Sequence, residues 1–204
     1  MIHFDAFRLL AAWIMLIAFV TPVFAQEAGT QKSAGWSVGE LMNGMAQVKK
    51  SSATFKEKKY ISMLTEPLLF AGTLEYTAPG RLEKHTRSPR RESMVLDGDR
   101  LEVQADEAGS RRILSLQEFP AIWALVESIR STLAGDVETL NRFYEVTVEG
   151  HRKRWMLKLS PRDSKMSSMV REIRIKGSRD QIGTIEIREA GGDRSVMEIT
   201  RVDS

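Results

Sequence analysis

The feature that most constrains this chain is a two-residue alternation of apolar and polar side chains. Leu74 and Tyr76, for example, alternate with Glu75 and Thr77. Successive side chains of a β-strand point to opposite faces of a sheet, so the alternation predicts strands with one dry and one wet face, typical of antiparallel sheets. The same pattern recurs in the segments 101–105, 144–148, 154–159, 173–176 and 185–188. The sequence therefore predicts about ten short strands, joined by turns such as 97–99.

Two other segments show the helical period. The first predicts a helix over 38–49, with Ser37 and Glu40 spaced as a capping box. The second carries an apolar stripe and ends near Gly135, and the stripe consists of Phe119, Ile122, Trp123, Val126, Ile129 and Leu133. Because two helices cannot cover a flat sheet of this size, the sheet must curl. We predict a mainly β (α+β) fold, an unclosed, curled antiparallel sheet (half-barrel) of about ten or eleven strands with helices as a lid.

The segment 1–25 has the pattern of a secretory signal peptide. Arg8 precedes an apolar run, and small side chains precede the expected cleavage site after Ala25. The run is too short to cross comfortably the ~30 Å hydrocarbon core of a bilayer, although an uncleaved N-terminal anchor is the alternative. Residues 26–35 are small and polar and predict a flexible N-terminal linker. We therefore expect a single domain over 36–204.

The composition argues against several classes of function. The chain has no cysteine, so disulfides, thiolate metal sites and cysteine nucleophiles are excluded. Its net charge of +3 is spread along the chain rather than clustered, which argues against a nucleic-acid partner. His85 and His151 lack the spacing of a zinc hydrolase, and no phosphate-binding loop, dinucleotide fingerprint or serine-hydrolase elbow occurs. We expect no catalytic residue, metal or cofactor.

A set of residues follows in a fixed order along the predicted strands. It comprises a phenylalanine in the first strand, a glycine that opens a G-x-L strand, two prolines ten residues apart, and an Asp-Gly turn followed by leucine. These residues are Phe55, Gly72, Leu74, Pro79, Pro89, Asp97, Gly98 and Leu101. The set resembles the LolA/LolB superfamily of outer-membrane lipoprotein carrier proteins, in its LolA-related branch. The segments 126–136, 159–166 and 192–199 also look like that branch, so the resemblance covers most of the chain after the signal peptide.

The resemblance implies an unclosed barrel whose helices form a lid over a hydrophobic cavity, in agreement with the pattern of the residues. It makes the apolar faces of the strands and of the second helix candidates for the cavity and its lid. The candidates are Phe55, Phe70, Leu74, Tyr76, Leu82, Leu101, Ile122, Trp123, Val126, Trp155 and Leu157. The alternation tells which residues share a face, but both cargo-contacting residues and ordinary core residues fit the same pattern.

Two positions depart from the family pattern. Ala78 stands just before the first proline, where the family's lipoprotein carrier has an arginine that hydrogen-bonds to the lid. Lys84 stands where that carrier has a tryptophan. The lid latch of that carrier is therefore missing here or replaced by another residue, for which Arg81 and Lys84 are nearby candidates.

The resemblance implies a periplasmic, non-enzymatic carrier. Its cargo would be a lipid or acyl moiety, borne by a lipoprotein or another lipophilic molecule, and would pass from an inner-membrane donor toward an outer-membrane acceptor. We expect a monomer that makes transient contact with membrane proteins. The alternative is a periplasmic sensor or adaptor of the same fold that binds a partner protein, and an enzyme of unknown type is a third possibility without residues to assign.

Overall fold

The computed structural model describes residues 36–105, 111–118 and 120–202, with side chains of the second helix described from Trp123 onward. The expected signal peptide, its cleavage site after Ala25 and the expected linker lie outside the described residues.

Eleven antiparallel strands within the described residues form one sheet that does not close, which confirms the predicted fold class. The order across the sheet is β6-β5-β4-β3-β2-β1-β11-β10-β9-β8-β7. The strands are β1 (Lys50–Tyr60), β2 (Leu68–Thr77), β3 (Arg81–Ser88), β4 (Glu92–Asp97), β5 (Arg100–Ala105), β6 (Arg111–Ser115), β7 (Tyr144–His151), β8 (Arg154–Pro161), β9 (Val170–Ser178), β10 (Gln181–Glu189) and β11 (Arg194–Arg201). Strands that pair in the sheet are consecutive in the chain except at β1–β11, where the first and last strands meet, and the consecutive strands β6 and β7 form the two edges.

The prolines of the family pattern end strands, as predicted. Pro79 lies in the turn between β2 and β3, and Pro89 follows the last residue of β3. Neither position needs a backbone N–H for the sheet ladder, which is why proline is tolerated there. The predicted turn 97–99 joins β4 to β5, and Gly98 adopts a φ of 60°, a left-handed conformation that glycine accepts without steric cost.

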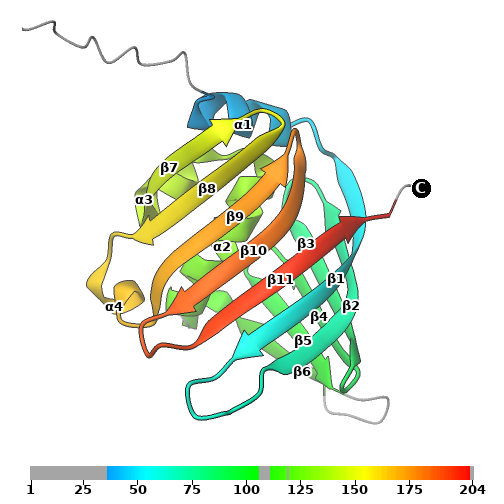
Figure 1. Cartoon of the computed structure of the whole chain (residues 1–204). Coiled ribbons are helices and arrows are strands. Elements are labelled where there is room, and N and C mark those ends of the chain that lie inside the picture. The colour runs from blue at the N-terminus through cyan, green and yellow to red at the C-terminus, as the bar shows by residue number, and fades with distance from the viewer. Residues whose placement is uncertain (1–35, 106–110, 119, 203–204) are drawn as a thin grey trace, which may run out of the picture. The chain divides into compact units, whose positions relative to one another are not determined.

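The helices lie along the inner face of the curled sheet. They are α1 (Val38–Met45), the 3₁₀ turn η1 (Leu116–Glu118), α2 (Pro120–Ala134), α3 (Val137–Phe143) and the short α4 (Ser164–Ser167). In Figure 1, strands β7–β11 face the viewer, β3–β6 curve away behind them, and α2 lies between the two arms. The sequence predicted α1 and α2 but missed α3 and α4.

The start of α1 is confirmed and its end differs from the prediction. The Ser37 side chain accepts from the Glu40 N–H at 3.1 Å, and the Glu40 carboxylate accepts from the Ser37 N–H at 2.9 Å, so the capping box is complete. The helix ends at Met45 rather than near Lys49. The Lys49 ammonium instead donates to the Ala46 carbonyl at 2.7 Å, satisfying a carbonyl that the helix leaves free.

The packed core fills one arm of the half-barrel. It joins the inner face of β7–β10 to α1, α2, α3 and α4. Its fully buried members include Leu41, Met42, Met45, Leu140, Tyr144, Trp155, Leu157, Leu159, Ile173 and Ile175. Tyr144 fastens α2 to this core, because its hydroxyl donates to the Ala124 carbonyl at 3.0 Å. The other arm of the sheet, toward β2–β5, surrounds the site described next.

Candidate functional site

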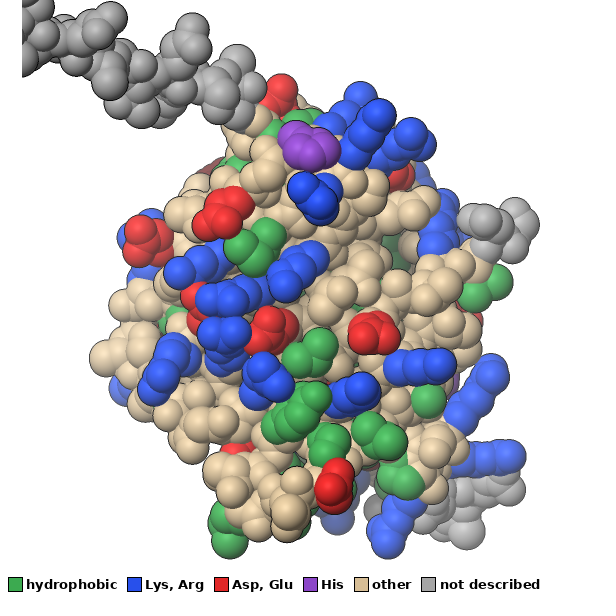
Figure 2. All heavy atoms as spheres, in the orientation of Figure 1, with side chains coloured by type: hydrophobic (Ala, Val, Ile, Leu, Met, Phe, Trp, Pro, Cys, Tyr) green, Lys and Arg blue, Asp and Glu red, His purple; other side chains and the backbone are tan. Residues whose placement is uncertain are grey.

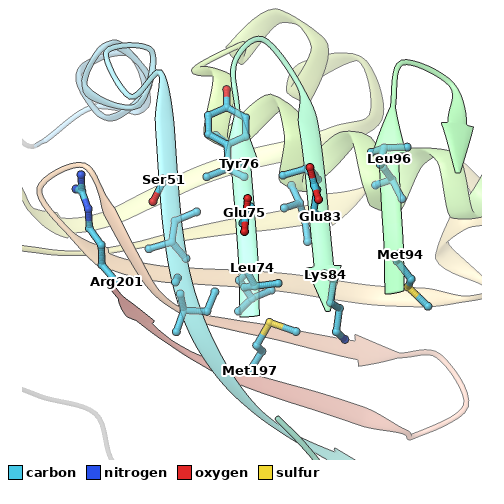
Figure 3. Close-up of a pocket in the computed structure, with 18 of the residues that line it drawn as sticks. Ser51, Leu74, Glu75, Tyr76, Glu83, Lys84, Met94, Leu96, Met197 and Arg201 are labelled. Carbon is cyan, nitrogen blue, oxygen red and sulfur yellow. The ribbon is translucent and has the colours of Figure 1, made fainter. Parts of the chain in front are cut away.

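A cavity of about 290 Å³ lies on the inner face of the sheet, between its two arms and α2 (Figure 3). Most of its lining is aliphatic. The apolar lining residues are Met45 of α1, Val48 after this helix, Ala53 of β1, Leu74, Tyr76, Leu82, Met94, Leu96 and Leu101 of β2–β5, Val126, Ile129 and Leu133 of α2, and Ile182, Ile185, Ile187, Met197 and Ile199 of β10 and β11. Such a lining gives apolar ligands a dry surface and offers them few hydrogen bonds.

Strand register explains why these side chains meet. Tyr76 lies opposite Leu82, Leu82 opposite Leu96, and Leu96 opposite Leu101, so one row of the sheet crosses four strands. The alternate residues Leu74 and Tyr76 of β2, Leu82 and Lys84 of β3, and Met94 and Leu96 of β4 therefore line the cavity together, which is the two-residue period of the sequence seen in space.

Five of the predicted site residues line the cavity together. They are Leu74, Tyr76, Leu82, Leu101 and Val126. Trp155 and Leu157 share the inner face but lie in the packed core on β8, where they are 2% and 0% exposed. The Trp155 indole N–H also donates to the Arg179 carbonyl at 2.9 Å, a structural contact.

Three further predicted residues, Trp123, Phe70 and Phe55, lie outside the lining. Trp123 packs edge-on against Phe143 of α3, with 5.0 Å between ring centroids. Phe70 is half-buried on β2. Phe55 is 2% exposed on β1 and lies beneath the ammonium group of Lys84. The side chain of Ile122 is not among those described.

The sequence reasoning missed a charged cluster within the lining, formed by Glu57 of β1, Lys84 of β3 and Ser195 of β11. The Lys84 ammonium donates to Glu57 Oε2 at 2.7 Å, and the Ser195 hydroxyl donates to Glu57 Oε1 at 2.6 Å. Lys84 also lies 4.9 Å from the centroid of the Phe55 ring, within range of a cation–π interaction. Burial raises the pKa of the Glu57 carboxyl, but hydrogen bonds from Lys84 and Ser195 outweigh burial and leave this pKa below its ordinary value.

The alternation did contain a signal for this cluster. Along β1, alternation places Glu57 on the same face as Ala53 and Phe55. Along β3 it places Lys84 on the same face as Leu82, so both charged residues occupy inward positions of their strands. A charge at an inward position is unusual in a half-buried sheet and marks a place where the interior is polar or accessible.

Arg130 fastens helix α2 to the arm of the sheet toward β2–β5, which surrounds the cavity and is called the hollow arm below. Its guanidinium donates to the Gly98 carbonyl, in the β4–β5 turn, at 2.7 Å and pairs with Glu127 one turn earlier in the helix. Its stem passes over Gly80, where an added Cβ would lie 2.6 Å from Arg130 Cδ. Arg81 and Lys84, the residues that the sequence offered for fastening the lid, make other contacts. Arg81 donates to Glu83 and Asp97, and Lys84 donates to Glu57, and all of these partners lie on strands.

A serine, a histidine and a glutamate also meet on the outer face of the sheet. Ser93 Oγ lies 3.0 Å from His85 Nδ1, and His85 Nε2 lies 3.2 Å from Glu83 Oε2. Both β3 and β4 are paired on both sides, so their backbone N–H groups are engaged in ladders and are not free to stabilise an oxyanion. The adjoining hollow, of about 550 Å³, is wide and lined by polar and charged side chains. We assign this group to surface hydrogen bonding.

Fold and cavity together define a β half-barrel built around an apolar internal site that a helix covers. Residues 30–199 match the family described as outer membrane lipoprotein carrier protein LolA-like, so the chain belongs to that family. Members of this family generally bind lipids or partner proteins rather than catalyse reactions. No curated protein matches the chain in sequence.

Several solved structures are similar in architecture. A LolA superfamily protein from Nitrosomonas europaea has 10% identity and a TM-score of 0.45, with 83% of this chain and 95% of that chain covered. A putative outer membrane lipoprotein-sorting protein domain from Vibrio parahaemolyticus has 10% identity and a TM-score of 0.42, with coverages of 80% and 88%. The MucA/MucB complex of Pseudomonas aeruginosa has 12% identity and a TM-score of 0.44, with 82% of this chain and 58% of that chain covered. At identities and TM-scores this low, no conclusion about ligand or partner follows.

The described residues contain neither a metal-binding cluster nor a helix able to span a membrane. No group of three or more histidine, aspartate or glutamate side chains within 36–105, 111–118 and 120–202 is arranged to hold a metal ion. Among the helices that the structure describes, none combines the length and apolar character required to span a bilayer.

Proposed function

We propose that this protein is a periplasmic, non-enzymatic carrier that binds a lipid or acyl moiety in the cavity under α2. The observation that carries the proposal is the largely aliphatic cavity of about 290 Å³ between the arms of the sheet and the helix. Each CH₂ group withdrawn from water contributes about 0.8 kcal/mol, so a chain of about twelve carbons gains roughly 10 kcal/mol by entering such a site. Membership of the LolA-like family supports the same conclusion.

The size of the cavity bears on the cargo. Its volume of about 290 Å³ lies just below the range of about 300–1,000 Å³ typical of small-ligand pockets. We infer that the cavity in this form takes one acyl chain, and that a lipoprotein or a lipid with several chains requires α2 to move outward. Arg130 is the contact that this movement must break.

The route of the cargo completes the proposal. The protein would be exported by the segment 1–25, cleaved after Ala25, and joined by the linker 26–35 to the carrier domain of 36–204. It would act as a monomer, take its cargo from an inner-membrane donor and pass it toward an outer-membrane acceptor, with transient contact at each. Transfer would proceed by lid opening and hydrophobic exchange, without a covalent step.

Native mass spectrometry tests this proposal. The mature protein is purified gently from the periplasm of its own source, weighed intact, and then extracted with organic solvent. We expect an added mass that the solvent removes and that is identified as a lipid or acyl compound. A clean mass without ligand, followed by no uptake of a fluorescent fatty acid, would contradict the carrier proposal.

A second candidate function is that of a sensor or adaptor for a partner protein. The observation that favours it is a group of exposed apolar side chains at the β1–β2 connection: Met63, Leu64, Leu68 and Leu69 are 91%, 48%, 40% and 60% exposed. Figure 2 shows hydrophobic side chains gathered near the ends of β1 and β2. Exposed apolar patches on soluble proteins often mark interaction sites.

Photo-cross-linking distinguishes the two candidates. A cross-linker placed at position 64 should give one discrete protein adduct in the periplasm if the adaptor function holds. This adduct should persist when the cavity is blocked by Leu74→Asp, since the β1–β2 connection lies apart from the cavity lining. An adduct that disappears with the cavity would point to a carrier whose contact depends on cargo.

A further inference from the structure

We propose that the Glu57–Lys84–Ser195 cluster is a headgroup site for an acyl chain that ends in an oxyanion, a carboxylate or a phosphate. The inference rests on the proposed carrier function and narrows its ligand class. It starts from the position of Lys84 beside the largely aliphatic part of the lining, whose other charged residues are Glu57, Glu75, Glu83, Asp180 and Arg201.

The hydrogen bonds leave the lysine with unused capacity. Glu57 is satisfied on both oxygens, by Lys84 and by Ser195, and its side chain is only 13% exposed. An ammonium group has three donors, and among the described residues Lys84 gives one of them, to Glu57. Its side chain remains 28% exposed and borders the cavity. A ligand oxygen can therefore approach the ammonium without displacing Glu57.

The position of the lysine is fixed before any ligand binds. Phe55 lies under the ammonium, and Gly72, opposite Phe55 on β2, leaves room for the ring because an added Cβ there would lie 2.8 Å from Phe55 Cε1. Glu57 and the Phe55 ring together hold a long side chain that would otherwise lose several rotamers on binding. Preorganisation of this kind favours binding, because the ordering cost has already been met.

The rows of side chains that cross the strands beside Lys84 set the direction in which the acyl chain of the ligand would lie. Lys84 pairs across the sheet with Leu74 on one side and Met94 on the other. The adjoining row contains Leu82 and Leu96, which line the cavity together with Val126 of α2. An oxyanion at Lys84 therefore places the attached acyl chain along an aliphatic path under the helix.

A purely structural role for the pair is the competing explanation, and it is energetically weak. A buried ion pair commonly contributes no more to stability than well-packed apolar residues of the same volume. Charge-assisted hydrogen bonds to an oxyanion, in contrast, are among the stronger polar contacts in proteins. The cluster therefore gains more from a ligand than from the fold alone.

A competition experiment with the mature, delipidated protein tests the inference. The neutral reporter N-phenyl-1-naphthylamine is displaced by palmitate, by hexadecyl phosphate and by palmitamide, which has the same chain without a charge. We expect the better of the two anions to bind about tenfold to a hundredfold more tightly than palmitamide. Comparison of the two anions identifies whether a carboxylate or a phosphate is preferred.

Three variants test whether Lys84 causes the preference for anionic ligands. Lys84→Met should abolish the preference for anions and leave palmitamide within about twofold of its original affinity. Glu57→Gln should strengthen anion binding, because it removes a negative charge beside the site. Lys56→Met is the matched control: it removes the same charge from an exposed position on the opposite face of β1 and should leave the preference intact.

The outcomes separate the two proposals. Equal affinities for the anions and palmitamide in the unmodified protein, or a preference that survives in Lys84→Met, would overturn the headgroup site while the carrier function stands. Failure of all three chains to displace a bound reporter would overturn both. Loss of the preference in Lys84→Met but not in Lys56→Met would support the site.

Discussion

Removal of Arg130 should release α2 from the hollow arm of the half-barrel. This side chain donates to the Gly98 carbonyl at 2.7 Å and pairs with Glu127, which is 4% exposed. Arg130→Met keeps most of the stem that passes over Gly80 and removes the charged group alone. The perturbation therefore tests the polar fastening of the helix rather than its packing.

The magnitude follows from the two contacts. A hydrogen bond from a charged donor contributes about 1.5–3 kcal/mol, and leaving one partner of a buried ion pair uncompensated costs about 3–5 kcal/mol. The two figures overlap, because both count the same guanidinium, and Arg130 is itself 24% exposed, so water compensates part of the loss. We expect the free energy of unfolding to fall by about 3 kcal/mol, which lowers Tm by roughly 6–12 °C in a domain of this length.

Thermal and urea unfolding, followed by circular dichroism, measure this loss. The matched variant is Arg130→Met combined with Glu127→Gln, which should recover about half of it because no buried charge remains. A single variant within about 0.5 kcal/mol of the original protein, or a double variant no more stable than the single one, would show that the polar contacts of Arg130 do not hold α2 in place.

The same variant has a kinetic consequence. If α2 covers the cavity, a looser helix should let ligand exchange faster while the equilibrium affinity changes less. Stopped-flow displacement of the neutral reporter measures the dissociation rate directly. An unchanged rate in a destabilised variant would mean that ligands enter by another route.

Three further predictions concern the sheet. Gly72→Ala should destabilise the fold by about 1–3 kcal/mol or more, because the Cβ of the new alanine would collide with the His85 carbonyl and the Phe55 ring. Urea unfolding measures this loss, and full stability of the variant would show that β2 shifts freely. Burial raises the pKa of Tyr144 to about 12, against about 10 when unfolded, so stability should fall by roughly 3 kcal/mol between pH ~10 and ~12. Tyr144→Phe should lose that pH dependence in urea titrations, and an identical profile would contradict the assignment. Leu74→Asp should abolish lipid uptake measured by fluorescence, whereas Leu69→Asp, exposed on the same strand, should not; equal effects would give Leu74 a plain structural role.

The sequence predicted the sheet well because the alternation is local information. Each strand shows its two faces within a few residues, and the glycine and proline positions mark its ends. The helices α3 and α4 escaped prediction because they have only 7 and 4 residues, too few to display a period. Their caps were present: Asp136 accepts from the Thr139 N–H and Asp163 from the Lys165 N–H, both at 2.9 Å.

The site was harder to predict, because the alternation shows on which face of the sheet a residue lies but not how deeply that residue is buried. Leu74 and Leu157 have the same pattern in the sequence, yet Leu74 lines the cavity and Leu157 is fully buried. The difference depends on which part of the curled sheet the helices cover, which is a property of packing between distant segments. The short α3, with Leu140 buried in the same core as Leu157, is one of those covers and was not predicted.

This division of the inner face also explains why the charged cluster lies where it does. Glu57 and Ser195 belong to β1 and β11, the strands where the chain's first and last segments meet in the middle of the sheet. On one side the helices fill the inner face with a dry packed core, and on the other a cavity remains beneath α2. A charge in the packed arm would lose its hydration without gaining hydrogen bonds to compensate for the loss. An aliphatic residue at the boundary, in turn, would offer a ligand no polar contact. The boundary is the position on the inner face where an ion pair remains accessible and where, under the proposed function, an acyl chain beside it would be shielded from water.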